Sequence, residues 1–234
     1  MKCFRCHAVL FDLDGVLVDS TAYVEDQWRR WALSKGLAAE PFLKVCHGRR
    51  ALETIRLAAP YLDAAAEVAA FKSDDVPAGP QIGAIEGAST LVHLLRHQSW
   101  AVATSGPRAA AAARLQQAGL PIPEVLVGAE DVRHGKPAPD VYLRAAEALK
   151  VLPSDCVVIE DAPAGIQAAR AAGMPVIALT TTHAREELQA DAWAASLAGI
   201  RLTIVENPSG TGPIQLLVAG DGRGLDLLGE AGLK

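Results

Sequence analysis

Residues 9–20 read Val-Leu-Phe-Asp-Leu-Asp-Gly-Val-Leu-Val-Asp-Ser, an apolar run that ends in two carboxylates one residue apart. In an extended chain residues i and i+2 point to the same side, so Asp12 and Asp14 are expected together at the carboxyl end of a strand. That end of a parallel sheet is where open α/β proteins bind ligands. A nucleophile beside a general acid/base, with a divalent cation between them, would explain two acids this close. A solvated Asp-Gly turn is the alternative that this segment alone leaves open.

Three later segments also carry polar residues that follow apolar runs or lie in Gly/Pro loops. They are Trp100-Ala-Val-Ala-Thr104-Ser105-Gly106, Gly135-Lys136-Pro137-Ala-Pro139 and Cys156-Val-Val-Ile-Glu160-Asp161-Ala-Pro-Ala-Gly165. In this order and spacing the four segments resemble the four motifs of the haloacid dehalogenase-like hydrolase superfamily, and the match runs from Val9 to Val205.

The alternation of elements predicts an α/β fold with a Rossmann-like parallel sheet and helices on both of its faces. Arg201–Val205 and Ile214–Val218 flank a Gly/Pro-rich stretch and are expected to form a terminal hairpin. Strand-length apolar runs stand at Val9–Phe11, Trp100–Thr104, Val125–Val127, Cys156–Glu160 and Val176–Leu179, and helix-like stretches at Pro107–Gly119, Ala138–Lys150 and Pro163–Gly173.

The stretch that follows the first strand has a different pattern and is predicted to form a separate helical domain. Residues 22–35, 49–59 and 62–73 are helical in composition, without β-branched runs or strand alternation. Pro77–Gly83 is rich in Pro and Gly and is expected to be the returning hinge. The predicted organisation is a catalytic core of residues 1–20 and 88–234 and a helical cap of residues 21–87, which in the resembled superfamily covers the active site.

The resemblance implies a role for each acidic motif residue in phosphoryl transfer. Asp12 would attack phosphorus and form an aspartyl phosphate, and Asp14 would protonate the leaving alkoxide and then deprotonate water. Asp161, with Glu160, the Asp12 carboxylate and the Asp14 backbone carbonyl, would hold Mg²⁺, which prefers oxygen ligands. Capping of the following helix is a competing role for one acid of the Glu160-Asp161 pair.

The other motif residues are expected to bind the phosphoryl group. The Thr104 hydroxyl can donate to a phosphate, together with Ser105, Gly106 and backbone N–H groups at the start of the next helix. A helix cap or a local turn is the competing interpretation of Thr104. Lys136 lies between Gly135 and Pro137, where a cation can neutralise both the phosphate and the crowded carboxylates.

Further segments resemble the glycerol-3-phosphate and 2-deoxyglucose-6-phosphate phosphatase branch, and imply a small phosphorylated sugar or polyol as substrate. These are His47-Gly-Arg-Arg50 in the cap, the stretch up to Arg108, and Thr180-Thr-Thr-His183. We expect His47, Arg49 and Arg50 to contact the leaving group, because the core motifs handle only the phosphoryl group. A solvated helix start is the alternative, and two adjacent arginines cannot both face one pocket.

Four other functions would require different residues from those present in this chain. A β-phosphoglucomutase-like mutase would carry a histidine early in the cap, where this chain has Val24. A dehalogenase would not need Asp14, and a phosphonatase would need a Schiff-base lysine, for which Lys44 and Lys72 have no suitable apolar setting. A noncatalytic phosphate-binding or regulatory module would be expected to lose Asp12 or Asp14.

Composition favours a cytoplasmic enzyme. The 234 residues carry a formal charge of −5, so no basic excess would attract nucleic acid or an anionic membrane surface. No apolar run has the length of a membrane span, and no signal peptide is recognised. Four cysteines in such a chain do not predict disulfides, and the Cys3/Cys6 pair is expected to lie in a frayed terminus. A monomer or weak dimer is expected.

Overall fold

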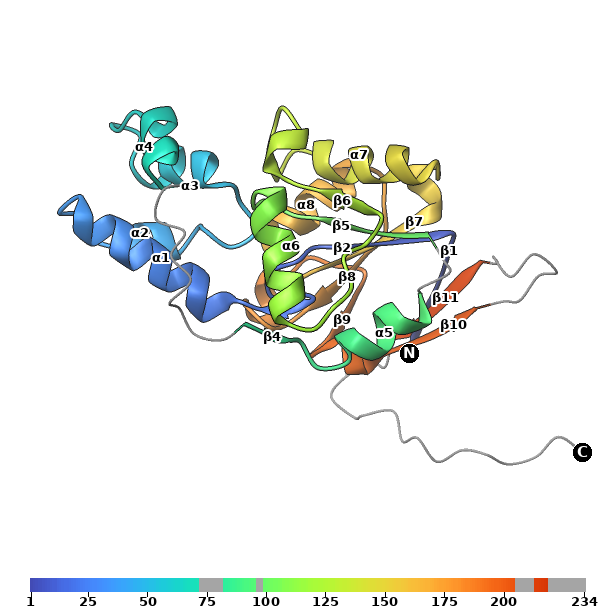
Figure 1. Ribbon diagram of the computed structural model, residues 1–234. Helices are drawn as coiled ribbons and strands as arrows, with labels where there is room; N and C mark the ends of the chain where they lie inside the picture. Colours follow the sequence, from blue (N-terminus) through green and yellow to red (C-terminus); the bar gives the residue numbers. More distant parts are fainter. Residues whose placement is uncertain (72–81, 96–98, 205–212, 219–234) are drawn as a thin grey trace, which may run out of the picture.

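The computed structural model describes residues 1–71, 82–95, 99–204 and 213–218, and its centre is a six-stranded sheet (Figure 1). The strand order is β6-β5-β2-β7-β8-β9, and every neighbouring pair is parallel. Five of these strands confirm the predicted ones, whereas the three-residue β9 is too short to leave a pattern in the sequence. The strands span Ala8–Phe11 (β2), Ser99–Ala103 (β5), Val125–Val127 (β6), Cys156–Glu160 (β7), Val176–Leu179 (β8) and Ala192–Ala194 (β9).

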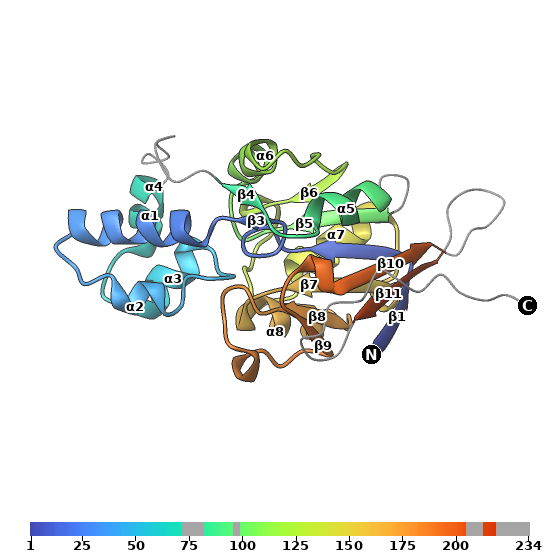
Figure 2. The same cartoon turned by 90° about the horizontal axis from the view of Figure 1, so that it is seen from below.

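Helices cover both faces of this sheet, as predicted (Figures 1 and 2). Because side chains alternate along a strand, Val9 and Phe11 of β2 pack in the cluster that holds α5 and α6, and Ala8 and Leu10 pack in the cluster that holds α7 and α8. The four helices are α5 (Ala88–Leu94), α6 (Arg108–Gln117), α7 (Asp140–Leu149) and α8 (Pro163–Ala171).

A second, antiparallel sheet has the order β1-β11-β10, with β10 at Ile200–Ile204 and β11 at Ile214–Val218. The predicted hairpin is therefore confirmed, although Val205 lies outside the described residues. The prediction of a frayed N-terminus is wrong: β1 (Lys2–Cys6) pairs with β11 along its whole length and buries Cys6. All four cysteines are free thiols, as expected.

In the described residues four helices lie between β3 and β4 and extend to one side of the core (Figure 2). We call them the cap: α1 (Thr21–Ser34), α2 (Glu40–Leu43), α3 (Ala51–Ala58) and α4 (Ala64–Phe71). They have a hydrophobic cluster of their own, in which the Trp28 ring lies 5.7 Å from that of Phe42 and nearly parallel to it. The predicted helical stretches are thus confirmed, although residues 72 and 73 of the third lie outside the described residues, and α2 was not predicted.

The chain leaves the core and returns to it at adjacent positions. β3 (Val18–Asp19) pairs antiparallel with β4 (Gly83–Ala84) on either side of the cap. Most of the predicted hinge Pro77–Gly83 lies outside the described residues. In the described ranges no helix has the length and apolar character that crossing a membrane requires.

Candidate active site

The motif residues meet because their strands are neighbours in a parallel sheet. β5 and β7 flank β2, and Asp12, Thr104 and Asp161 each follow the last residue of one of these strands. Lys136, in the loop before α7, reaches the same place from outside the sheet. The side chains of Asp12, Thr104, Lys136, Glu160 and Asp161 are all buried, which excludes the solvated-turn interpretation of Asp12.

Lys136 supplies a buried positive charge between two carboxylates. Its Nζ lies 2.5 Å from Asp12 Oδ1 and 2.7 Å from Glu160 Oε1, and it stands 4.9 Å from the centre of the Tyr142 ring. Burial alone would lower the pKa of Lys136, but Asp12 and Glu160 outweigh it and hold that pKa well above the usual value. The lysine therefore stays charged beside Asp12.

Glu160 has its hydrogen-bonding positions filled by protein groups. Oε1 accepts from Lys136 and from the Tyr142 hydroxyl (2.9 Å), and Oε2 accepts from the backbone N–H groups of Asp161 (2.7 Å) and Ala162 (2.9 Å). Burial opposes ionisation, but Lys136 and these hydrogen bonds lower the pKa of Glu160. Gly165 packs against this carboxylate so closely that a Cβ there would lie 1.5 Å from Oε1. Glu160 is thus built to hold Lys136, and it has little capacity left for direct coordination of a cation.

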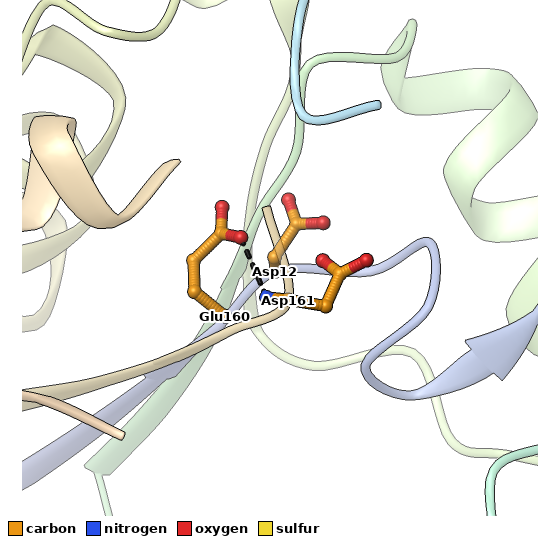
Figure 3. A group of neighbouring side chains, drawn as sticks. All are labelled: Asp12, Glu160 and Asp161. Carbon is orange, nitrogen blue, oxygen red and sulfur yellow. Dashed lines mark hydrogen bonds between the residues drawn. The ribbon is translucent and has the colours of Figure 1, made fainter. Parts of the chain in front are cut away.

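Three carboxylates lie close enough to share a cation (Figure 3). Asp12, Glu160 and Asp161 each offer an oxygen within 4.8 Å of the other two. Burial, followed by the charges of Glu160 and Asp12, raises the pKa of Asp161 well above its usual value. Burial likewise raises the pKa of Asp12, to about 7. The positive charge of Lys136 opposes this rise, whereas the negative charges of Glu160 and Asp14 add to it.

Asp161 has an oxygen with no partner. Its Oδ2 accepts a 2.5 Å hydrogen bond from Thr182 Oγ1, but Oδ1 is buried and accepts none from the described residues. A buried carboxylate oxygen without a partner is costly unless something pairs with it. The excess of negative charge and this unpaired oxygen suit a hard divalent cation held by Asp161 and Asp12.

Asp14 is held apart from this carboxylate cluster. Its Oδ1 accepts from Ser20 Oγ (2.5 Å) and from Arg114 Nη1 (2.7 Å), and its Oδ2 accepts from the same Nη1 (2.9 Å). Asp14 and Asp12 nevertheless line one cavity, so the predicted proximity of the pair at the sheet edge is met.

A cavity of about 500 Å³ lies between the cap and the carboxyl end of the sheet. The core side contributes Thr104, whose Oγ1 accepts from the Gly106 backbone N–H (3.1 Å) and can still donate its own proton. Ser105 Oγ donates to the Gly48 carbonyl in the cap (2.9 Å). The cap side includes Val24, Gln27, Trp28, Cys46, His47, Gly48, Arg49, Arg50, Leu52 and Val68.

The two cap arginines have different surroundings. Arg50 forms an ion pair with Glu53 and donates to the carbonyls of Ala129 (3.3 Å), Val132 (3.2 Å) and Arg133 (3.2 Å) in the core. Arg49 donates only to the carbonyl of Val45 (3.2 Å) among the described residues. Arg50 therefore joins cap to core, whereas most of the donors of Arg49 remain available to the cavity.

His47 also faces the core. Its ring lies 6.0 Å from the ring of His183, edge to face, and its Nε2 is 3.6 Å from Glu25 Oε1. Burial and the nearby His183 lower the pKa of His47, so its neutral form is favoured. A neutral imidazole can serve as donor or acceptor to a hydroxylated ligand.

Three residues contact the motif residues in a way that the sequence did not predict. Tyr142 and Thr182 orient Glu160 and Asp161, and Arg114 binds Asp14. Thr182 lies in the Thr180–His183 segment that the resemblance had already singled out. Tyr142 and Arg114 lie on helices that read as ordinary amphipathic or Ala-rich segments, so no local pattern distinguishes them from structural residues.

The chain belongs to the haloacid dehalogenase-like hydrolase family, whose model matches residues 6–173. Hexitol phosphatase A of Escherichia coli (strain K12) is 41% identical over 217 residues, which cover 90% of this chain and all of that protein. Validoxylamine A 7'-phosphate phosphatase of Streptomyces hygroscopicus subsp. limoneus is 39% identical over 82% of this chain and 94% of its own length. A hydrolase from Pseudomonas syringae has a similar structure, with a TM-score of 0.71 and 26% identity over 81% of this chain and 94% of that one. The protein is therefore a phosphatase of this family.

The role of Tyr142 in holding Glu160 can be tested by stability. Tyr142→Phe removes one buried hydrogen bond to a charged acceptor and should lower the free energy of unfolding by about 1.5–3 kcal/mol. Urea denaturation followed by circular dichroism measures this loss. Tyr61→Phe, at an exposed position in the cap, is the matched control and should be neutral. Equal stability of both variants would contradict the role given to the Tyr142 hydroxyl.

Proposed function

We propose that the protein is a Mg²⁺-dependent phosphomonoester hydrolase that cleaves a small sugar or polyol phosphate through an aspartyl-phosphate intermediate on Asp12. The observation that carries the proposal is the buried Asp12 carboxylate, paired with Lys136 and adjacent to an Asp161 oxygen that has no partner among the residues the structure describes. The names of the similar phosphatases support substrates of this class.

The residues divide the chemistry between two steps. In the first, an Asp12 oxygen bonds to phosphorus as the bond to the leaving oxygen breaks, and Asp14 gives that oxygen a proton. In the second, water attacks phosphorus, Asp14 takes its proton, and the Asp12–phosphorus bond breaks to release inorganic phosphate. Thr104 and Lys136 stabilise charge on the phosphoryl oxygens, with Ser105 and Gly106 beside them.

Asp12, Asp161 and the Asp14 backbone carbonyl would hold the Mg²⁺ ion. When bound there, the cation neutralises negative charge shared by the carboxylates and the phosphoryl group. Glu160 acts on this site through Lys136 and the Asp161 backbone, in keeping with its filled hydrogen-bonding positions.

The cap, taken as residues 21–87, would select the leaving group. His47 and Arg49 line the cavity from the cap and offer donors or acceptors to a hydroxylated substrate, and Arg50 would keep the cap docked on the core. Val24 lines the cavity where the resembled mutases would place a histidine, and its apolar side chain cannot transfer a proton. Hydrolysis is therefore favoured over a mutase reaction.

Loss of the nucleophile is the first test. Asp12→Asn keeps the side-chain volume but removes the attacking carboxylate, so phosphate release from sorbitol 6-phosphate should fall to background. Chelation of divalent cations by EDTA should also abolish turnover of the wild type, and added Mg²⁺ should restore it. A variant that keeps more than a small fraction of the activity would contradict the covalent mechanism.

Asp14→Asn should affect substrates unequally. General-acid assistance is worth about 10²–10⁴-fold and matters most for a poor leaving group. The loss in kcat/KM should therefore be much larger for sorbitol 6-phosphate than for p-nitrophenyl phosphate. Equal losses on the two substrates would count against the acid role of Asp14.

The different surroundings of the cap arginines predict different kinetic effects. Arg49→Ala should lower kcat/KM for sorbitol 6-phosphate by about 1–3 kcal/mol equivalent and leave hydrolysis of acetyl phosphate, which has no hydroxyl groups, nearly unchanged. Arg50→Ala should lower both activities, because it removes contacts between cap and core. Arg56→Ala, at an exposed position on α3, is the control. Equal losses of Arg49→Ala on sorbitol 6-phosphate and acetyl phosphate would contradict a role of Arg49 in substrate specificity.

A further inference from the structure

Arg114 is a nearly buried arginine whose guanidinium reaches the carboxylate of Asp14. It lies on α6, one hundred residues along the chain from Asp14, and its side chain is 12% exposed. One guanidinium nitrogen, Nη1, lies within hydrogen-bond distance of both carboxylate oxygens, at 2.7 and 2.9 Å. Arg114 also lines the cavity between cap and core, together with Asp12 and Asp14.

The arginine is itself supported by the cap. Its guanidinium carbon lies 5.2 Å from the centre of the Tyr23 ring, in the first turn of α1. On the other side, Asp14 is held by the hydroxyl of Ser20, the residue before α1. The Asp14 carboxylate is thus fixed between a core helix and the start of the cap.

Backbone hydrogen bonds hold the turn that carries Asp14, but they do not fix the direction of its side chain. Asp14 follows the last strand residue by three positions, makes a single isolated bridge to Val18, and precedes Gly15, whose φ is 80°. A side chain on a turn has several rotamers of similar energy, and misplacement of a proton donor by about 1 Å can cost about 10²-fold in rate.

We propose that Arg114 is a positioning residue that fixes the carboxyl group of Asp14 for proton transfer to and from the reacting oxygens. The inference rests on the proposed function, in which Asp14 is the general acid/base. Helix α6 would then both cover the sheet and position Asp14. The contact of Arg114 with Tyr23 would link the cap to the proton donor.

A direct contact of Arg114 with substrate is the competing explanation, since the side chain lines the cavity. The two explanations differ in what Asp14 must contribute. A positioning residue acts only while Asp14 is present, whereas a substrate-binding residue acts whether or not Asp14 is present. A kinetic double-mutant cycle separates them.

The experiment measures kcat/KM of wild type, Arg114→Gln, Asp14→Asn and the double variant on sorbitol 6-phosphate and p-nitrophenyl phosphate. Since kcat/KM reports steps up to the first irreversible one, it isolates leaving-group departure from hydrolysis of the intermediate. Arg114→Gln should lose about 10- to 100-fold on sorbitol 6-phosphate and less than about threefold on p-nitrophenyl phosphate. In the Asp14→Asn background the same change should have no further effect.

Two further variants serve as a charge-conserving rescue, Arg114→Lys, and as a control at an exposed arginine, Arg144→Gln. Lysine keeps the charge and can reach one oxygen, so it should recover part of the lost rate. Arg144 lies on α7, is exposed and among the described residues pairs with Glu147 alone, so its variant should match the wild type on both substrates. Equal losses on the two substrates, a loss that persists in the Asp14→Asn background, or a gain in rate for Arg114→Gln would each overturn the proposal.

Thermal unfolding of the same four proteins gives a readout that needs no activity. If the contact exists in solution, the Tm changes of the two single variants should be non-additive in the double variant. Additive changes would overturn the inference even if the proposed function holds. A wild type that hydrolyses neither substrate would instead overturn the proposed function, and the thermal cycle would still decide whether Arg114 holds Asp14.

Discussion

The ion pair of Lys136 with Asp12 and Glu160 is the interaction on which the rest of the site depends. Three charged groups are buried there. Removal of either the lysine or its carboxylates would leave a buried charge unpaired and would destabilise the fold by about 3–5 kcal/mol. Hydrogen bonds to Glu160 from Tyr142 and from the backbone after β7 stabilise the buried charges. This buried ionic centre joins three separate parts of the chain, namely the end of β2, the loop before α7 and the end of β7.

Negative charge still exceeds positive charge at this centre. Asp161 adds a third carboxylate whose Oδ1 has no partner in the described part of the chain. Burial raises the pKa values of Asp12 and Asp161, and the neighbouring carboxylates add to that effect. A divalent cation and a phosphoryl group, with opposite charges, would complete the arrangement. The donor set explains why we propose Mg²⁺ and why Glu160 is assigned to Lys136.

The proposed function places substrate selection and phosphoryl chemistry on opposite sides of one cavity. The ends of the core strands contribute Asp12 and Thr104, and the cap lines the cavity with a mixture of apolar and basic side chains. Arg50, Ser105 and Arg114 link the two parts through contacts with the opposite side. Because Arg114 contacts both Tyr23 in the cap and Asp14, movement of the cap would change the surroundings of Asp14 as well as the shape of the cavity.

The sequence by itself determined the family, five of the six strands of the parallel sheet and the motif residues, because each of these leaves a local pattern. Apolar runs followed by acids identified Asp12 and Asp161, and the Gly-Lys-Pro loop identified Lys136. Only the tertiary structure decided how Glu160, Arg50 and Arg114 are used, since their partners lie 24, about 80 and 100 residues away along the chain. The N-terminal strand was missed for the same reason, because β1 is stabilised by pairing with β11 at the far end of the described chain. Local patterns fix which residues end a strand, whereas hydrogen bonding between distant segments fixes what each charged side chain does.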